Sequence, residues 1–159
     1  ILAFNEIDRV DPIDYVESWD IVLENAVSTE LKYKDEIYRE KLTELQYNVT
    51  RNSSTEYPFS GELWDEKRLG TYTCICCGHI LFTSEMKFNS GCGWPSFHTE
   101  HKDASITQIE DRTHGMVRVE VKCSKCDAHL GHIFNDGPRK YGGERYCINS
   151  ASMDFEERD

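Results

Sequence analysis

Four of the seven cysteines stand in two closely spaced pairs, Cys74 with Cys77 and Cys123 with Cys126. In each CxxC pair the two-residue gap folds into a tight knuckle that aims both sulfurs at one point. The glycine that follows the first pair, Gly78, eases the backbone into that shape. Two such pairs close a tetrahedral thiolate cage around zinc, and the full shell leaves no open position for a reactant. The spacing therefore predicts one structural Zn²⁺ per chain, tying two hairpins together.

Other interpretations of these cysteines stay open. Either CxxC could be a redox pair, although thioredoxin-like motifs belong on a βαβ background that this sequence lacks. Cys76 could replace Cys74 as a ligand, but the adjacent Cys76 and Cys77 fit a single cage poorly. We therefore interpret Cys76 as a spare thiol. His129 follows Cys126 closely enough for a Cys₃His site, although four cysteines already complete the shell.

Cys147 lies outside those pairs, and the assignment of a function depends on whether its thiol is reactive. If its segment is a strand, Arg145, Cys147 and Asn149 share one face while Tyr146 and Ile148 point to the other. The thiol would then lie between a cation that favours the thiolate and an amide that can orient a ligand. A lone cysteine is more often a small buried apolar residue, and that interpretation also stays open.

Two histidines and a tryptophan could complete a site around this thiol. His129 and His132 are three residues apart, so on a regular strand they would face opposite sides. Gly131 would have to kink the backbone for both rings to line one cleft. Taken alone, each histidine is more often structural than catalytic. Trp94 stands between a glycine and a proline, where a bulky ring in a rigid loop could form the wall of a small apolar pocket.

Cys92 lies in the same loop, between Gly91 and Gly93. Two glycines make the loop pliable, which a resolving cysteine requires, because it must approach an oxidised partner to a disulfide distance near 2.05 Å. A thiol held in one place could not do this.

Short β-type runs after residue 58 would position these side chains. They are Thr71–Ile75, Ile80–Thr83, Ser105–Ile109, Val117–Val121 and Arg145–Asn149. The run from Val117 to Val121 alternates strictly, which predicts that its valines are buried on one face. The pattern indicates a core of antiparallel β-strands.

The first third of the chain favours helices instead. Asp11 followed by Pro12 is typical of a helix start, and Thr43 to Gln46 fits a capping box that could begin a second, short helix. Residues 1–30 hold eight acidic residues and one basic residue. We predict that residues 1–30 are an acidic N-terminal extension, a helical linker or docking segment, and that residues 31–159 are the main domain.

Composition excludes several classes of function. The 159 residues carry a net charge of −11, which would repel the phosphate backbone of a nucleic acid, and no apolar run is long enough to span a bilayer. An odd number of cysteines argues against a disulfide framework. We expect no nucleic-acid or membrane partner, and a cytoplasmic or other reducing compartment.

Taken together, these motifs resemble the B-type methionine sulfoxide reductases, which act on the R epimer of methionine sulfoxide. The resemblance runs from about Leu42 to Asp154. It rests on the segments Pro58–Gly61, Ser90–Phe97, His129–Pro138 and Arg145–Ser152, together with Cys74, Cys77, Cys123 and Cys126. Cys76 and residues 1–30 are not part of it.

The resemblance implies a β domain of two antiparallel sheets, preceded here by the N-terminal helices, with residues 31–159 as the methionine-R-sulfoxide reductase domain. It implies a nucleophile at Cys147 and a resolving cysteine at Cys92. The remaining residues that it implies are the zinc ligands Cys74, Cys77, Cys123 and Cys126, the polar active-site residues His129, His132 and Asn149, and the substrate-binding residues Trp94, Phe134 and Arg145.

The chemistry of a sulfoxide agrees with this assignment. A thiolate can attack the sulfoxide sulfur only if an acid protonates the departing oxygen. Our hypothesis is that Cys147 attacks, that His132 delivers the proton with help from His129, and that Asn149 orients the sulfoxide or the imidazole. Cys147 is left as a sulfenic acid, Cys92 condenses with it to a disulfide, and thioredoxin reduces the disulfide. The expected substrates are oxidised proteins or peptides that contain methionine-R-sulfoxide.

Two other functions remain open from the residues alone. One is a zinc-stapled module that binds a protein partner and in which Cys147 and Cys92 are ordinary buried residues. The other is a general thiol peroxidase or disulfide oxidoreductase. The ratio of rates with methionine-R-sulfoxide and with hydrogen peroxide separates the latter from the reductase.

Overall fold

The computed structural model describes residues 35–158, and residues 35–41 are helical. The chain from Leu42 onward forms a unit of its own. The predicted acidic extension, including the helix start at Asp11, lies outside the described residues. Within the described part of the chain, no helix has the length and apolar character needed to cross a membrane.

Helix α3 (Glu44–Asn52) begins at the predicted capping box. The hydroxyl of Thr43 accepts a hydrogen bond from the backbone N–H of Gln46 at 3.2 Å, and the Gln46 side chain accepts one from the backbone N–H of Thr43 at 2.9 Å. The helix buries one face, which includes Tyr47 and Val49, and packs on strand β7. The sequence-based expectation for this helix start is confirmed.

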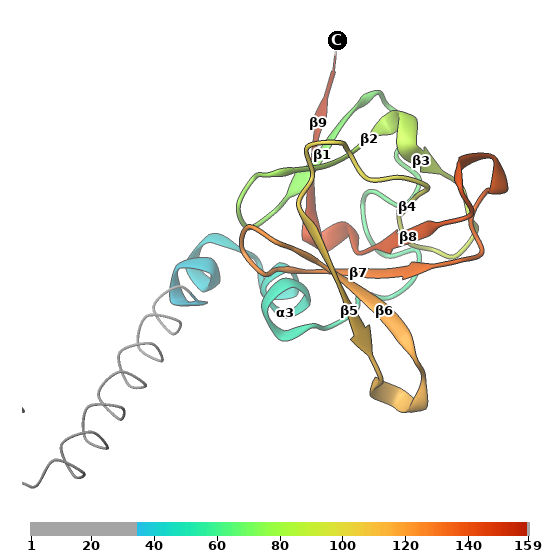
Figure 1. Cartoon of the computed structure of the whole chain (residues 1–159). Helices are drawn as coiled ribbons and strands as arrows, with labels where there is room; N and C mark the ends of the chain where they lie inside the picture. The colour runs from blue at the N-terminus through green and yellow to red at the C-terminus, as the bar shows by residue number, and fades with distance from the viewer. Residues whose placement is uncertain (1–34, 159) are drawn as a thin grey trace, which may run out of the picture. The chain divides into compact units, whose positions relative to one another are not determined.

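Two antiparallel sheets make up the rest of the unit (Figure 1). The smaller has the order β2 (Ile80–Thr83), β1 (Gly70–Cys74), β9 (Met153–Glu157). The larger has the order β3 (Lys87–Phe88), β4 (Ser96–Phe97), β8 (Arg145–Ile148), β7 (His129–Phe134), β6 (Arg118–Cys123), β5 (Ile106–Asp111). Short 3₁₀ turns are η1 (Ser84–Met86), η2 (Thr113–Gly115), η3 (Arg139–Tyr141) and η4 (Ser150–Ser152). The predicted class, mainly β with two antiparallel sheets after N-terminal helices, is confirmed.

The five predicted strands all exist, with ends that differ by at most two residues. The expectation that the valines of Val117–Val121 share a buried face was wrong for Val117, which is 67% exposed, whereas Val121 is fully buried. Strand β6 begins only after Val117, and the β5–β6 hairpin projects beyond the other strands (Figure 1). Alternation predicts which face a side chain takes, but burial also requires a second layer over that face.

An aromatic cluster joins the two sheets. Phe82 of β2 stacks on Phe97 of β4, with ring centroids 4.1 Å apart, and Tyr72 of β1 meets Phe97 edge-on at 5.0 Å. Tyr146 of β8 contacts Phe82 at 5.5 Å. Because these rings pack between the sheets, they fix β8 and β4, which carry Tyr146 and Phe97, against the smaller sheet.

Strand β7 carries one extra residue opposite β6. Val121 pairs with Gly131 while the adjacent Lys122 pairs with His129, so Leu130 is the residue without a counterpart. A bulge of this kind reverses the side-chain alternation on one side of it. This irregularity is the backbone kink that the spacing of the two histidines required.

Gly131 allows β8 to approach β7 closely. A Cβ atom at this position would run into the backbone carbonyl oxygen of Cys147. We predict that Gly131→Ala destabilises the fold by roughly 1–3 kcal/mol, because overpacking against backbone cannot be relieved by a side-chain rotation. Urea unfolding of the variant and of the wild type measures the difference, and equal stabilities would contradict the close approach.

Candidate active site and metal centre

Strand β8 places Cys147 between two polar neighbours. Cys147 pairs with Ser96 of β4 on one side and with His132 of β7 on the other. Residues directly opposite each other in antiparallel strands share a face, so these three side chains lie together. Tyr146 and Ile148 point the other way and are buried in the core, as the sequence predicted.

Cys92, predicted from the sequence as the resolving cysteine, reaches the same face from the loop between β3 and β4. Its Sγ lies 3.9 Å from the Sγ of Cys147, and both thiols are reduced. The structure therefore brings together two sulfur atoms that are 55 residues apart in sequence.

The two thiols differ in acidity. The pKa of Cys147 is raised to about 12, mainly by burial and also by the adjacent Cys92, while Arg145 opposes both effects. The sequence had led us to expect that Arg145 would favour the thiolate, but its effect is smaller than that of burial. Burial also raises the pKa of Cys92, yet hydrogen bonds with Ser90, Ser96, the Trp94 backbone and Cys147 together outweigh it and leave that pKa below its usual range. In the free protein, Cys92 is the more acidic of the two.

A small cavity of about 100 Å³ opens at Cys147. Five of the predicted site residues line it, namely Trp94, His132, Phe134, Cys147 and Asn149. Gly131 also lines the cavity, and Thr55 and Arg118, which the sequence analysis did not single out, complete the lining. The cavity combines aromatic walls with an imidazole and a thiol, so it can hold a small, partly apolar group against the sulfur.

Each histidine of β7 is paired with a carboxylate from another strand of the sheet, His129 with one from the adjacent β6 and His132 with one from β5. The Nε2 atom of His132 lies 2.8 Å from Asp111, which also accepts a hydrogen bond from Arg118 at 3.3 Å. The Nδ1 atom of His129 lies 2.6 Å from Glu120. The hydrogen bond with His132 lowers the pKa of Asp111 below its usual range, and burial lowers the pKa of His129. The centroids of the two imidazole rings are 5.7 Å apart. Of the two histidines, His132 lines the cavity, and His129 contacts it from outside the cavity.

Arg145 does not line the cavity itself but packs on Phe134, which does. Its guanidinium lies over the Phe134 ring, 4.5 Å from the centroid, and pairs with Asp136 at 2.8 Å. These contacts hold the cation next to Cys147 without covering the thiol. Of the eight predicted catalytic and substrate-binding residues, five line the cavity, and the other three, Cys92, His129 and Arg145, each contact one of those five.

Asn149 braces the backbone behind the cavity. Its Nδ2 donates to the carbonyl of Leu130 at 3.0 Å, and its Oδ1 accepts from the N–H of Glu56 at 3.1 Å. The amide thus fixes the bulged segment of β7 that precedes His132.

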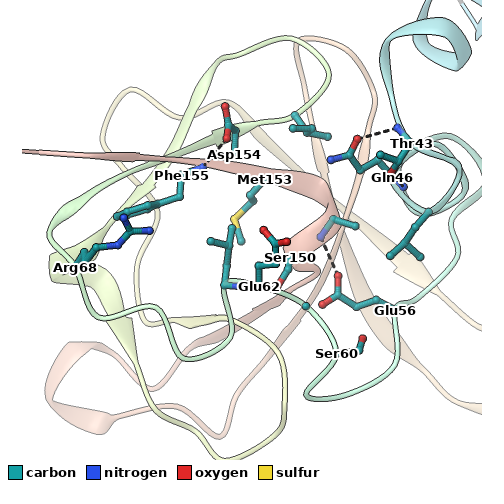
Figure 2. A pocket seen from close by; sticks show the side chains of 15 residues that line it. Thr43, Gln46, Glu56, Ser60, Glu62, Arg68, Ser150, Met153, Asp154 and Phe155 are labelled. Atoms are coloured by element: carbon teal, nitrogen blue, oxygen red, sulfur yellow. Dashed lines mark hydrogen bonds between the residues drawn. The ribbon is translucent and has the colours of Figure 1, made fainter.

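Glu56 connects three parts of this site, and the sequence analysis missed it. Its backbone N–H binds Asn149, its carbonyl accepts from the indole N–H of Trp94 at 3.1 Å, and its carboxylate accepts from the N–H of Ala151 at 2.8 Å. Figure 2 shows this carboxylate beside Ser150, in a separate hollow of about 450 Å³. Glu56 is 3% exposed, and burial raises the pKa of its carboxyl group.

The missed residues share one property. Glu56, Asp111 and Glu120 are carboxylates that meet their partners across strands or loops, at separations of 9 to 95 residues. No local spacing marks them out from the other acidic residues of the chain. The register of β5, β6 and β7 pairs Asp111 with Arg118 and Glu120 with His132, so knowledge of that register would have indicated both carboxylates.

A second group of side chains forms a candidate metal centre. The Sγ atoms of Cys74, Cys77, Cys123 and Cys126 all lie within 4.8 Å of one another. The Cys74–Cys126 and Cys77–Cys123 distances are 3.5 Å and 3.6 Å. Zn–S bonds of about 2.3 Å in a tetrahedron require sulfurs about 3.8 Å apart, so this donor set fits a zinc-sized ion. Cys76 and His129 are outside the group of four.

The backbone of both knuckles takes the same shape. Gly78 donates to the carbonyl of Cys74 at 2.8 Å, and Asp127 donates to the carbonyl of Cys123 at 2.7 Å. Both residues have positive φ, 79° for Gly78 and 64° for Asp127. Arg51 of α3 donates to the carbonyl of Cys126 at 2.8 Å. The helix therefore supports the second knuckle, and the glycine stands where the backbone requires a left-handed residue.

Comparisons with known proteins agree with this geometry. Residues 42–157 match the model of the SelR domain family. A protein of Hahella chejuensis named "Peptide methionine sulfoxide reductase MsrB" is 54% identical over 129 residues, which are 81% of this chain and 92% of that protein. A protein of the same name from Cellvibrio japonicus is 52% identical over 77% of this chain and 86% of its own length. The "Probable methionine-R-sulfoxide reductase B" of Caenorhabditis elegans is 55% identical over 71% of this chain and 75% of its own length.

The buried carboxyl group of Glu56 predicts a dependence of stability on pH. A carboxyl group whose pKa is raised by folding stabilises the fold below its unfolded pKa of 4.5, and this contribution is lost as the pH rises through the folded pKa. We expect the stability of Glu56→Gln relative to the wild type to increase as the pH rises from 4 to 8, because the glutamine stays neutral while the buried carboxyl group of the wild type must ionise. Urea unfolding across this range measures it, with Glu62→Gln in the same hollow as control. A pH-independent difference would contradict burial as the cause.

Proposed function

Since this chain belongs to the SelR family of methionine-R-sulfoxide reductases, we propose that it reduces methionine-R-sulfoxide in peptides and proteins through Cys147 and is recycled through Cys92. The observation that carries the proposal is the position of Cys147. Its thiol lies at a small aromatic cavity, opposite His132 in the sheet and 3.9 Å from a second thiol. A binding module has no need of this combination.

The cavity supports a binding mode for the substrate. The S-methyl group of the sulfoxide enters between Trp94 and Phe134, which places the sulfoxide sulfur next to Cys147. The oxygen then points toward His132 and Arg118, the polar lining of the same cavity. This orientation depends on Glu56, because the indole of Trp94 donates its N–H to the Glu56 carbonyl.

In the first step, Cys147 attacks the sulfoxide sulfur and the sulfoxide oxygen is protonated. The high pKa of Cys147 means that the thiol brings its own proton, and His132 relays this proton to the oxygen. Asp111 holds the imidazole in place, while His129 and Glu120 support it from behind. The oxygen passes to Cys147, which becomes a sulfenic acid, and the sulfoxide leaves as the thioether.

Asn149 acts in this scheme through the backbone. Its amide fixes the bulge before His132 and lines the cavity, so it orients the imidazole and bounds the substrate's position. Arg145, paired with Asp136, keeps a positive charge beside Cys147 and favours negative charge that develops on sulfur in the transition state.

Recycling uses the second thiol. Cys92 attacks the sulfenic acid, water leaves, and a Cys92–Cys147 disulfide forms. An external dithiol protein, thioredoxin, reduces this disulfide and returns both cysteines to the thiol form. The half-exposed position of Cys92 at the surface loop supports its role as the sulfur that such a partner reaches.

The four-cysteine cluster holds a structural Zn²⁺ in this proposal. The donor set is four thiolates at tetrahedral spacing, which is typical of structural zinc. Cys74 belongs to β1 of the smaller sheet and Cys123 to β6 of the larger one, so the ion connects the two sheets. It supplies no open position for chemistry, and no step of the reaction passes through it.

Two cysteine variants separate the two halves of the reaction. Cys147→Ser is expected to lose turnover, because no sulfur remains to attack. Cys92→Ser is expected to yield about one methionine per enzyme and then stop with thioredoxin as reductant, because the sulfenic acid has no intramolecular partner. Chromatography of the methionine formed, with R and S epimers of the sulfoxide assayed separately, measures both results.

Three outcomes would contradict the assignment: full thioredoxin-dependent turnover by Cys92→Ser, a preference for the S epimer, or faster reaction with hydrogen peroxide than with the R sulfoxide. Cys76→Ser is the matched control, because Cys76 is a buried thiol away from the cavity.

Metal removal tests the cluster. We expect one zinc per chain by elemental analysis of the purified protein, and a loss of that zinc in Cys123→Ser but not in Cys76→Ser. Chelation under reducing conditions is expected to lower Tm by roughly 10 °C or more, because metal-binding free energy is part of the folding free energy. Retention of zinc in Cys123→Ser would contradict the ligand set.

A further inference from the structure

Two hydroxyl groups surround the sulfur of Cys92, and the reaction scheme above does not use them. The Oγ of Ser90 donates to the Cys92 Sγ at 2.9 Å, a short distance for a sulfur acceptor. The Oγ of Ser96 lies 3.4 Å from the same sulfur. The two hydroxyls are 2.6 Å apart, so they form one hydrogen-bonded pair beside the thiol.

The fold fixes this pair from two elements. Ser96 belongs to β4, stands opposite Cys147 and is 1% exposed, so its hydroxyl is held on the reactive face. Ser90 is exposed and lies in the turn that leads to Cys92. In that turn Gly91 has a φ of 77° and donates to the side chain of Asn89 at 3.0 Å, while the N–H of Cys92 donates to Ser90 Oγ at 3.4 Å. The turn therefore folds the Ser90 hydroxyl back onto the sulfur two residues later.

We propose that Ser90 is a catalytic residue of the recycling step, whose hydroxyl donates to Cys92 and holds it as a thiolate ready to attack oxidised Cys147, and that Ser96 positions this hydroxyl. Each hydroxyl has one proton, so while Ser90 donates to the sulfur, Ser96 donates to Ser90 Oγ or to the Trp94 carbonyl, which lies 3.2 Å away. This inference rests on the proposed function, because it assumes that Cys147 becomes a sulfenic acid. A thiolate accepts hydrogen bonds and a thiol is a weak acceptor, so donors aimed at sulfur favour the charged form.

The step balances without a further reactant. The Cys92 thiolate attacks the Sγ of Cys147, the S–S bond forms, and the S–O bond of the sulfenic acid breaks. The departing hydroxide takes up the proton that Cys92 released on ionising, and water leaves. The sulfenic sulfur is reduced and the Cys92 sulfur is oxidised, each to the level of the disulfide.

The surroundings of Cys92 agree with this role. Its pKa is lowered although burial opposes ionisation, and the groups that lower it include both serines. Within the described part of the chain, the titratable groups facing Cys92 are Cys147 and Arg145, both from β8. Together with burial, the negative charge of the Cys92 thiolate keeps Cys147 protonated before substrate arrives. The two sulfurs must then close from 3.9 Å to about 2.05 Å, and Ser90 can follow because it belongs to the same turn.

A single-turnover experiment tests the proposal with Ser90→Ala, Ser96→Ala and the double variant. The rate of methionine formation reports the first step. The rate at which the sulfenic acid is converted to the disulfide reports the second, and it is measured by trapping the remaining sulfenic acid with dimedone and quantifying the adduct by mass spectrometry. We expect the ratio of the second rate to the first to fall by about 10-fold or more in the double variant. The pH midpoint of disulfide formation is expected to rise. Ser90→Thr, which keeps the hydroxyl, is expected to restore the wild-type ratio.

A second measurement does not depend on sulfoxide reduction. In the Cys147→Ser background, the rate of Cys92 alkylation by iodoacetamide is measured against pH, with the site identified by peptide mapping. The midpoint is expected to move to higher pH when Ser90 is replaced by alanine. Because Ser90 is exposed, this variant keeps the core intact even if Ser96→Ala fails to fold.

The outcomes are distinct. An unchanged alkylation midpoint together with an unchanged rate ratio overturns the role of the serines. A loss of both rates in equal proportion, with a lower Tm and no rescue by Ser90→Thr, assigns the serines a structural role and also overturns it. If the wild type forms no methionine while the alkylation midpoint still shifts, the proposed function fails and the serine–cysteine interaction stands.

Discussion

The position of β8 inside the larger sheet is the constraint on which the rest of the site depends. Its odd and even residues have different tasks, because side chains alternate across a strand. Tyr146 and Ile148 are buried and tie the strand to the aromatic core, so Cys147 must point to the opposite face. The flanking strands then supply Ser96 on one side and His132 on the other. A shift by one residue would bury the thiol in the core and expose the tyrosine.

The limited access of water to the thiol of Cys147 determines the protonation state of that thiol and the need for ion pairing around it. Burial keeps Cys147 protonated, while each nearby ionisable group has a specific partner: His132 with Asp111, His129 with Glu120, Arg145 with Asp136. Pairing lowers the cost of holding charged or polar groups in a partly buried site, because hydrogen bonds replace much of the lost contact with water. The replacement is incomplete, since the Nε2 of His129 and the Nε of Arg118 are buried without a hydrogen-bond partner among the described residues. The reactive face is therefore polar and ordered, although its lining is largely aromatic.

The cysteines divide into groups with different physical roles. Four form the cage that connects β1 with β6, and two face each other at the cavity. Tight knuckles with a left-handed residue hold the cage sulfurs at nearly fixed spacing, whereas a turn around Gly91 carries Cys92. A metal cage needs fixed sulfurs, and a recycling thiol needs a loop that can close by about 2 Å. The backbone around each group suits the role proposed for it.

Local spacing in the sequence determined a large part of this. The CxxC pairs predicted the ligand set, Thr43 and Gln46 predicted the start of α3, and the alternation from Arg145 to Asn149 predicted which side chains accompany Cys147, because each of these depends on residues a few positions apart. Only the tertiary structure decided that Asp111, Glu120 and Glu56 hold the histidines and the indole, and that Val117 is exposed. It also decided that burial outweighs Arg145 at Cys147. These outcomes depend on strand register, layering and access of water, which are set by contacts between residues far apart in the chain.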